Sequence, residues 1–126
     1  MTSKPKVRGG IVGSGFAANL HYEGIRRVYG TDIDLAGVFS PTADNAQRFA
    51  GRHGLRTFSS LEALLDEVQV VHVCASPAAH EAITVAALAR GVHAIVEKPL
   101  TGWFGDGTAD FHASGASMQS ALDGAL

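Results

Sequence analysis

The chain is poor in cysteine, in net charge and in long hydrophobic runs, and each shortage excludes a class of protein. Its single cysteine, Cys74, cannot form an internal disulfide, which argues against a disulfide-stapled secreted scaffold and fits a reducing cytoplasm. A formal net charge of −2 gives no electrostatic reason to expect nucleic acid or an anionic membrane as a partner. No apolar run approaches the roughly 18 residues that a membrane-spanning helix needs. The 126 residues therefore predict one cytoplasmic domain, long enough to bury a hydrophobic core.

Patterns typical of strands and of helices alternate along the chain up to residue 100. Strands are expected at residues 7–12, 33–39, 56–58, 70–74 and 92–96. Helices are expected at residues 16–29, 41–53, 61–65 and 76–90. This order predicts an α/β fold, a Rossmann-type doubly wound parallel sheet of about five strands with helices on its faces. The chain then divides into a Rossmann domain at residues 1–100, a Gly/Ser-rich loop at 101–117 and the start of a helix at 118–126.

A glycine turn joins the first expected strand to the first expected helix. Glycine lets the backbone turn tightly and approach a phosphate, and a helix N-terminus offers free N–H groups and a partial positive charge. Ala18 takes the third position of the fingerprint, which the motif allows. The alternative is an ordinary strand–helix turn without a ligand. We predict that a dinucleotide pyrophosphate binds at this turn, against Gly13, Ser14, Gly15, Phe16 and Ala17.

The residue that should contact the adenosine ribose lies at the end of the second expected strand. An acid is usual there, but Asp34 lies near the start of the strand and Ser40 occupies its end. A serine can bond the ribose 2′-hydroxyl, and its neutrality does not repel a 2′-phosphate. Ser40 is also a good N-cap for a helix that starts at Pro41, and both roles stay open. Arg48 could reach a phosphate or be an ordinary surface arginine, so the cofactor is NAD or NADP.

The segment after the fourth expected strand carries a second group of candidate site residues. Ligands of open α/β sheets bind beyond the carboxyl ends of the strands. Ser76, Pro77 and His80 follow such an end, so we predict that they line the nicotinamide side of the cleft. The alternative for His80 is a surface histidine.

The fifth expected strand ends in Glu97-Lys98-Pro99. Charges at such a rim are costly unless they are solvated or paired. A lysine beside a substrate hydroxyl can donate a proton or orient the oxygen, which makes Lys98 the candidate catalytic residue and Glu97 a candidate cofactor-binding residue. The X–Pro bond at Pro99 can be cis. The alternative is a solvated strand end stopped by proline.

Together these residues resemble the Gfo/Idh/MocA family of NAD(P)-dependent oxidoreductases. The resemblance spans about residues 6–100 and rests on three segments in register and one histidine: residues 10–16, His21, residues 76–80 and residues 97–100. It implies an N-terminal Rossmann domain that binds NAD or NADP. It also implies that Lys98 lies near the substrate carbon that exchanges hydride, in a sugar, inositol or other polyol.

The sequence departs from that family in two respects. Family members carry a C-terminal α/β domain that supplies much of the substrate pocket, and we expect no counterpart of it within these 126 residues. A glycine-containing insertion at residues 101–107 also stands where common members enter a helix. We therefore expect a truncated cofactor-binding domain with little turnover alone, which self-associates or depends on a chain that supplies the missing domain. The alternatives are a non-catalytic dinucleotide-binding module, a subunit of a split enzyme, or a non-functional truncated product.

Overall fold

The computed structural model describes residues 3–105 and 118–125. Residues 106–117 of the loop expected at 101–117 lie outside the described part, as does the last residue of the helix expected at 118–126. The strands are β1 (Lys6–Val12), β2 (Asp32–Phe39), β3 (Val70–Val73) and β4 (His93–Val96). The helices are α1 (Phe16–Ile25), α2 (Ala43–His53), α3 (Leu61–Leu65), α4 (His80–Ala89, after a 3₁₀ turn at Pro77–Ala79) and α5 (Met118–Ala125).

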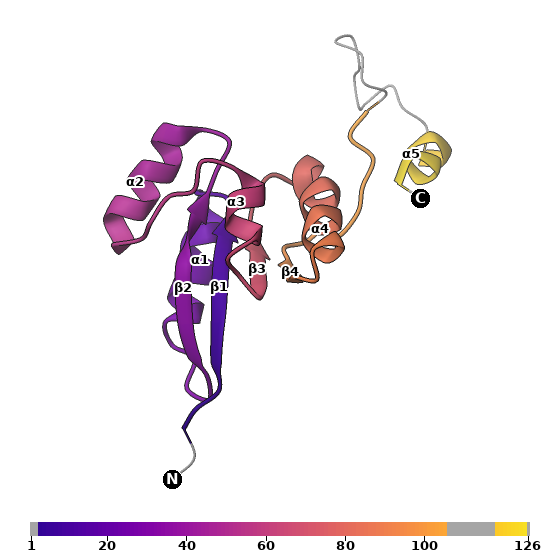
Figure 1. Cartoon of the computed structure of the whole chain (residues 1–126). Coiled ribbons are helices and arrows are strands. Elements are labelled where there is room, and N and C mark those ends of the chain that lie inside the picture. The colour runs from indigo at the N-terminus through magenta and orange to yellow at the C-terminus, as the bar shows by residue number, and fades with distance from the viewer. Residues whose placement is uncertain (1–2, 106–117, 126) are drawn as a thin grey trace.

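The strands form one parallel sheet in the order β2-β1-β3-β4. The chain leaves β1 toward β2 on one side and later returns to place β3 on the other side of β1. The loops after β1 and β3 therefore diverge to opposite faces of the sheet. The crevice between these loops is where open α/β sheets bind ligands. This arrangement confirms the expected Rossmann-like α/β fold (Figure 1).

The sheet has four strands rather than the five expected from the sequence. The segment expected as the third strand, residues 56–58, makes only an isolated parallel bridge between Thr57 and Val38. Two backbone bonds hold it, from Val38 N to Arg56 O and from Phe58 N to Val38 O, both 2.9 Å long. The segment is too short to continue the ladder, because Phe58 then turns into the core and leads to α3.

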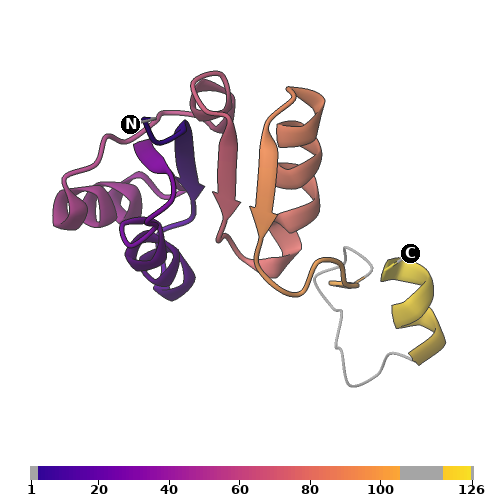
Figure 2. The same cartoon turned by 90° about the horizontal axis from the view of Figure 1, so that it is seen from below.

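Alternating side chains of the strands build a hydrophobic core on each face of the sheet. Val12, Val71 and Val73 pack with α3 and α4 on one face. Ile11 and Val38 pack with α1 and α2 on the other, as the period of two along a strand requires. Figure 2 shows α4 along β3 and β4, with α1 and α2 toward the β1–β2 side and α5 apart from the sheet. The two cores fix the positions of the carboxyl ends of the strands relative to one another.

Two helices differ from the sequence expectation at their ends. The helix expected at residues 16–29 ends at Ile25, and Val28 and Tyr29 beyond it are exposed. The helix expected from Ser76 starts instead with the 3₁₀ turn, and regular α4 begins at His80. Among the described residues, no helix combines the length and apolar character that crossing a membrane would require.

Candidate functional site

The β1–α1 turn requires glycine at its first position. Gly13 has φ +113°, and a Cβ there would lie 2.6 Å from the carbonyl oxygen of Cys74. Its N–H donates to the Phe39 carbonyl over 2.8 Å, which ties the turn to the end of β2. Gly15 is the N-cap of α1 without a side-chain cap, and α1 has no acid in its first turn. The free N–H groups of α1 therefore face the crevice with no competing carboxylate.

The hydroxyl of Ser40 faces this turn and does not cap a helix. The expected capping role of Ser40 is wrong, because α2 begins at Ala43 and its N-cap is Thr42. Ser40 instead lies one residue beyond β2, where Ser14 Oγ donates to Ser40 Oγ over 3.2 Å. Asp34, the acid that a motif search would choose, lies at the other end of β2 and pairs with Arg8 at 3.3 Å.

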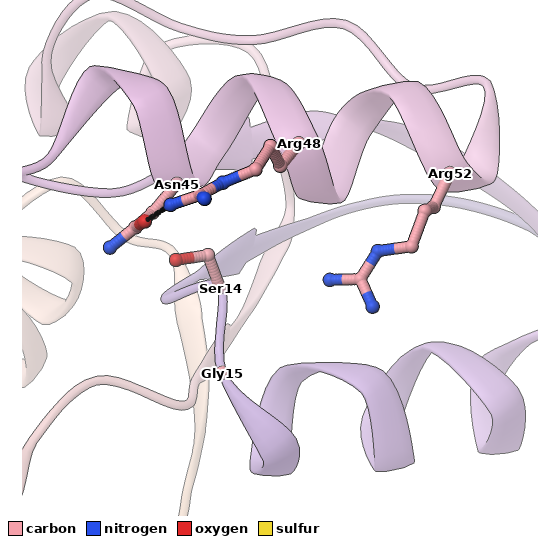
Figure 3. A pocket seen from close by; sticks show the side chains of 5 residues that line it. All are labelled: Ser14, Gly15, Asn45, Arg48 and Arg52. Carbon is pink, nitrogen blue, oxygen red and sulfur yellow. Dashed lines mark hydrogen bonds between the residues drawn. The ribbon is translucent and has the colours of Figure 1, made fainter.

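Two hollows meet at the glycine turn. One, of about 680 Å³, lies between the turn and α2 and is lined by Ser14, Gly15, Asn45, Arg48 and Arg52 (Figure 3). The other, of about 500 Å³, runs along the carboxyl ends of the strands; among the predicted site residues it is lined by Gly13, Ser14, Gly15, Ser40 and Ser76. The shared residues join the hollows into one surface. Phe16, the first residue of α1, is 84% exposed beside that surface, and Ala17 follows it half-buried.

The structure places His80 away from this surface. The imidazole is 1% exposed, so it is neither the cleft-lining group nor the surface histidine that the sequence suggested. Nδ1 lies 2.9 Å from the Pro99 carbonyl oxygen and Nε2 lies 3.0 Å from the Ala75 carbonyl oxygen. The buried His80 side chain therefore connects the loop after β3 with the loop after β4 on the interior side of both loops. Pro77 remains exposed at the start of the 3₁₀ turn.

Glu97 ends a chain of hydrogen bonds that begins inside the sheet. His21 Nε2 donates to Glu97 Oε1 over 2.7 Å, and the Nδ1 atoms of His21 and His72 lie 2.9 Å apart. The other carboxylate oxygen accepts from Lys98 N over 3.3 Å. The carboxylate is thereby fixed, while the Lys98 side chain is exposed. The Lys98–Pro99 peptide bond is cis, as the sequence allowed.

Burial and hydrogen bonding set the protonation states of Glu97 and of two groups near it, His72 and Cys74. The hydrogen bond from His21 holds the pKa of Glu97 below its ordinary value of 4.5, so the carboxylate is ionised at neutral pH. Burial, and then repulsion from His21, lowers the pKa of His72 to about 4, so His72 is neutral. Burial, and then the negative charge of Glu97, raises the pKa of Cys74 to about 12, so its thiol is unreactive. Lys98 is the exposed cation of this end of the sheet.

Two features of the site escaped the sequence analysis. Asn45 and Arg52 were not considered, although Arg48 and Arg52 are four residues apart and so share a helix face. The pairing of His21 with Glu97 joins residues 76 positions apart, which no local pattern reveals. The described residues contain no cluster of three or more His, Cys, Asp or Glu side chains that could hold a metal ion.

Relatives of known activity match the region that forms this site. UDP-N-acetylglucosamine 3-dehydrogenase of Acidithiobacillus ferrooxidans is 35% identical over 95 residues, which are 75% of this chain and 29% of that protein. Inositol 2-dehydrogenase of Leifsonia xyli is 34% identical over 103 residues, 80% of this chain and 30% of that protein. The chain thus spans about 30% of the length of these relatives.

Solved structures resemble the same region. GenD2 from gentamicin A biosynthesis, in complex with NAD, matches with a TM-score of 0.69 and 31% identity, over 76% of this chain and 28% of that one. Biliverdin reductase of Synechocystis sp. PCC 6803, in complex with biliverdin and NADP⁺, matches with a TM-score of 0.66 and 33% identity, over 75% of this chain and 30% of that one. A family model described as an oxidoreductase family with an NAD-binding Rossmann fold matches residues 7–111. The chain therefore belongs to the Gfo/Idh/MocA oxidoreductase family and comprises its NAD(P)-binding Rossmann domain.

Proposed function

We propose that this chain binds the pyrophosphate of NAD or NADP at the β1–α1 turn, as the cofactor half of an oxidoreductase. The observation that carries this proposal is the uncapped N-terminus of α1 at the crevice, directly after a glycine turn that a Cβ would block. Backbone N–H groups and the helix dipole stabilise phosphate there. The pyrophosphate contacts are assigned to Gly13, Ser14, Gly15, Phe16 and Ala17.

The remaining predicted residues extend from this turn toward the reacting end. Ser40 is assigned to the adenosine ribose, while Ser76 and Pro77 flank the nicotinamide. Glu97 borders the cofactor as a fixed anion, and Lys98 orients or protonates the substrate oxygen. When bound, the nicotinamide ring gives or receives the hydride. His80 serves this end by positioning the two loops rather than by touching a ligand.

The substrate class we assign is a sugar, an inositol or a related polyol. The two relatives named above act on a nucleotide sugar and on inositol, and both are more than three times longer than the part that matches. Lys98 lies on an exposed loop, so residues from elsewhere must complete its pocket. We assign these to a further segment or a partner chain, and we expect little turnover from this chain alone. The single cysteine, buried and unreactive, suits the cytoplasm.

The test is a fluorescence titration of the purified chain with NADH and with NADPH. A carboxylate introduced by Gly15→Asp would lie where the phosphate binds, and should weaken binding of both cofactors by at least about 100-fold. Nothing lies within 4 Å of a Cβ at Gly15, and aspartate is a good N-cap, so the fold should be kept. The matched control is Gly24→Asp in the same helix, where a Cβ also meets nothing.

Saturable binding that Gly15→Asp removes and Gly24→Asp keeps supports the proposal. No binding by a folded wild-type chain, or equal binding by the wild type and Gly15→Asp, overturns it. Circular dichroism of each variant separates a lost site from a lost fold.

A further inference from the structure

Arg48 and Arg52 lie on the side of α2 that faces the glycine turn. Figure 3 shows the Arg48 side chain lying along α2 toward Asn45, above Ser14, and the Arg52 side chain pointing into the gap between α2 and α1. The four-residue spacing places the two guanidinium groups one turn apart on one helix face. Arg48 also donates to Asn45 Oδ1, which directs its guanidinium along the cavity.

These two arginines have no carboxylate partner among the described residues. Every other arginine of the chain is paired with a carboxylate: Arg8 with Asp34 and Glu67, Arg26 and Arg27 with Glu23, Arg56 with Glu67, and Arg90 with Asp66. The cavity between α2 and the glycine turn has no acidic lining residue. The positive potentials of the two guanidinium groups and of the α1 N-terminus therefore add in this cavity, and no lining carboxylate offsets them. Such a potential favours an anion.

The end of β2 is neutral where a carboxylate would exclude a phosphate. Ser40 occupies that position, and its hydroxyl is already bonded to Ser14, a residue that lines the arginine cavity. The two acidic residues near Ser40 in sequence do not line this cavity. Asp34 is paired at the far end of the strand, and Asp44 in the first turn of α2 does not line the cavity. A ribose held at Ser40 would have its 2′ substituent beside the cavity.

We propose that Arg48 and Arg52 bind the 2′-phosphate of NADP, so that the chain prefers NADP over NAD. This inference rests on the proposed function, because it needs the adenosine ribose at Ser40. Guanidinium groups donate paired hydrogen bonds that match phosphate oxygens, and they remain charged at any physiological pH. Without the phosphate the two arginines would lie beside a neutral 2′-hydroxyl, with no anion to offset the repulsion between their charges.

The solved relatives leave this choice open, since one is bound to NAD and another to NADP⁺. The distinction is therefore a property of this chain's own side chains. It rests on the serine at the end of β2 together with the two unpaired arginines of α2.

The experiment uses two fragments of the cofactor that lack the nicotinamide. The chain is titrated calorimetrically with adenosine 2′,5′-bisphosphate and with AMP, which differs from it only in lacking the 2′-phosphate. We expect the bisphosphate to bind at least about 30-fold more tightly, as two charge-assisted hydrogen-bonding groups provide. The double variant Arg48→Ala/Arg52→Ala should lose that ratio, and Arg48→Lys/Arg52→Lys should keep part of it. Arg26→Ala/Arg27→Ala is the control, because it removes the same charge from the paired arginines of α1.

The outcomes separate the two proposals. If AMP and the bisphosphate bind equally and NADH still binds, the 2′-phosphate site is overturned while the proposed function stands. If the control lowers the ratio as much as the α2 variant does, general charge accounts for the preference and the site is also overturned. If a folded chain binds neither fragment nor NADH, both proposals fail.

Discussion

The two ends of the cofactor crevice are built by different means. At the β1–β2 end, which we call the phosphate end (Gly13, Ser14, Gly15, Ser40), the surface is backbone and small hydroxyls, with two arginines above it. At the β3–β4 end, which we call the hydride end (Ala75, Ser76, residues 97–99), histidines fix the loops from inside the protein. The first end presents the uncapped N-terminus of α1 and two arginines, and the second presents an exposed lysine.

The two ends also differ in how many of the groups needed for cofactor binding or for hydride transfer lie within this chain. Phosphate recognition needs N–H groups and fixed cations, and the phosphate end provides both within the chain. Hydride transfer needs a substrate held against the cofactor, and the hydride end presents only a hydrogen-bonded glutamate and an exposed lysine. Ile95 beside it is 47% exposed, so the sheet here is open on the α1 face. We expect the phosphate end to bind on its own and the hydride end to need a further pocket.

The largest effect is expected from Gly13→Ala at the phosphate end. The new Cβ would lie 2.6 Å from a backbone carbonyl at a φ of +113°, so neither a rotamer change nor a side-chain shift relieves it. We expect a loss of about 4 kcal/mol in the free energy of unfolding, measured by urea denaturation. Gly15→Ala is the control, and it should change stability by less than about 1 kcal/mol, since its Cβ meets nothing. Equal stability of the two variants would contradict the tight turn.

His80→Ala should loosen the hydride end alone. It removes the imidazole that lies between the Ala75 and Pro99 carbonyls and leaves a buried cavity, at a cost of about 3 kcal/mol. Hydrogen exchange should accelerate at residues 75–79 and 97–101, with little change at residues 13–15. Uniform acceleration across the sheet would show that the two ends are not independent.

A smaller effect is expected from acid, through His72. Its pKa is about 4 in the folded chain against an ordinary 6.5, so the unfolded chain binds the proton first as the pH falls. Stability should therefore be full above pH 6.5 and fall by about 2 kcal/mol between pH 6.5 and 4. Protonation of Glu97 removes further stability only below its ordinary pKa of 4.5, because the folded pKa is lower still.

His72→Asn removes the first of these two effects and keeps the second. Thermal melts of both proteins across pH 4–7 measure the difference. If the wild type and His72→Asn show the same slope between pH 6.5 and 4.5, the buried neutral histidine is not its cause.

The phosphate end was the more predictable from sequence, because its signals are local. The glycine turn combines strand, glycines and helix within a few residues, and the structure has strand, turn and helix in those places. Ser40 was ambiguous, since Ser-Pro is a good helix start. The structure excludes the capping role, because the helix begins only after Thr42 and the Ser40 hydroxyl faces Ser14.

The hydride end was less predictable because long-range contacts form it. The histidine at position 80 follows the pattern of a cleft residue, yet it is buried, with one ring nitrogen beside the nearby Ala75 carbonyl and the other beside the Pro99 carbonyl of the loop after β4. Away from this end, the segment at residues 56–58 was also expected to be a strand, but it makes only an isolated bridge to β2. Glu97 and Lys98 were recognised by their chemistry, whereas the histidines behind Glu97 come from other elements of the sheet.

The most direct test of the account is a nuclear magnetic resonance titration of the chain with adenosine 2′,5′-bisphosphate. Saturable shifts of the amides of Gly13, Gly15 and Ser40 and of the guanidinium groups of Arg48 and Arg52, with Lys98 unchanged, are the predicted result. They would show a phosphate end that is complete within this chain. Shifts centred on the hydride end, or none in a folded protein, would contradict it.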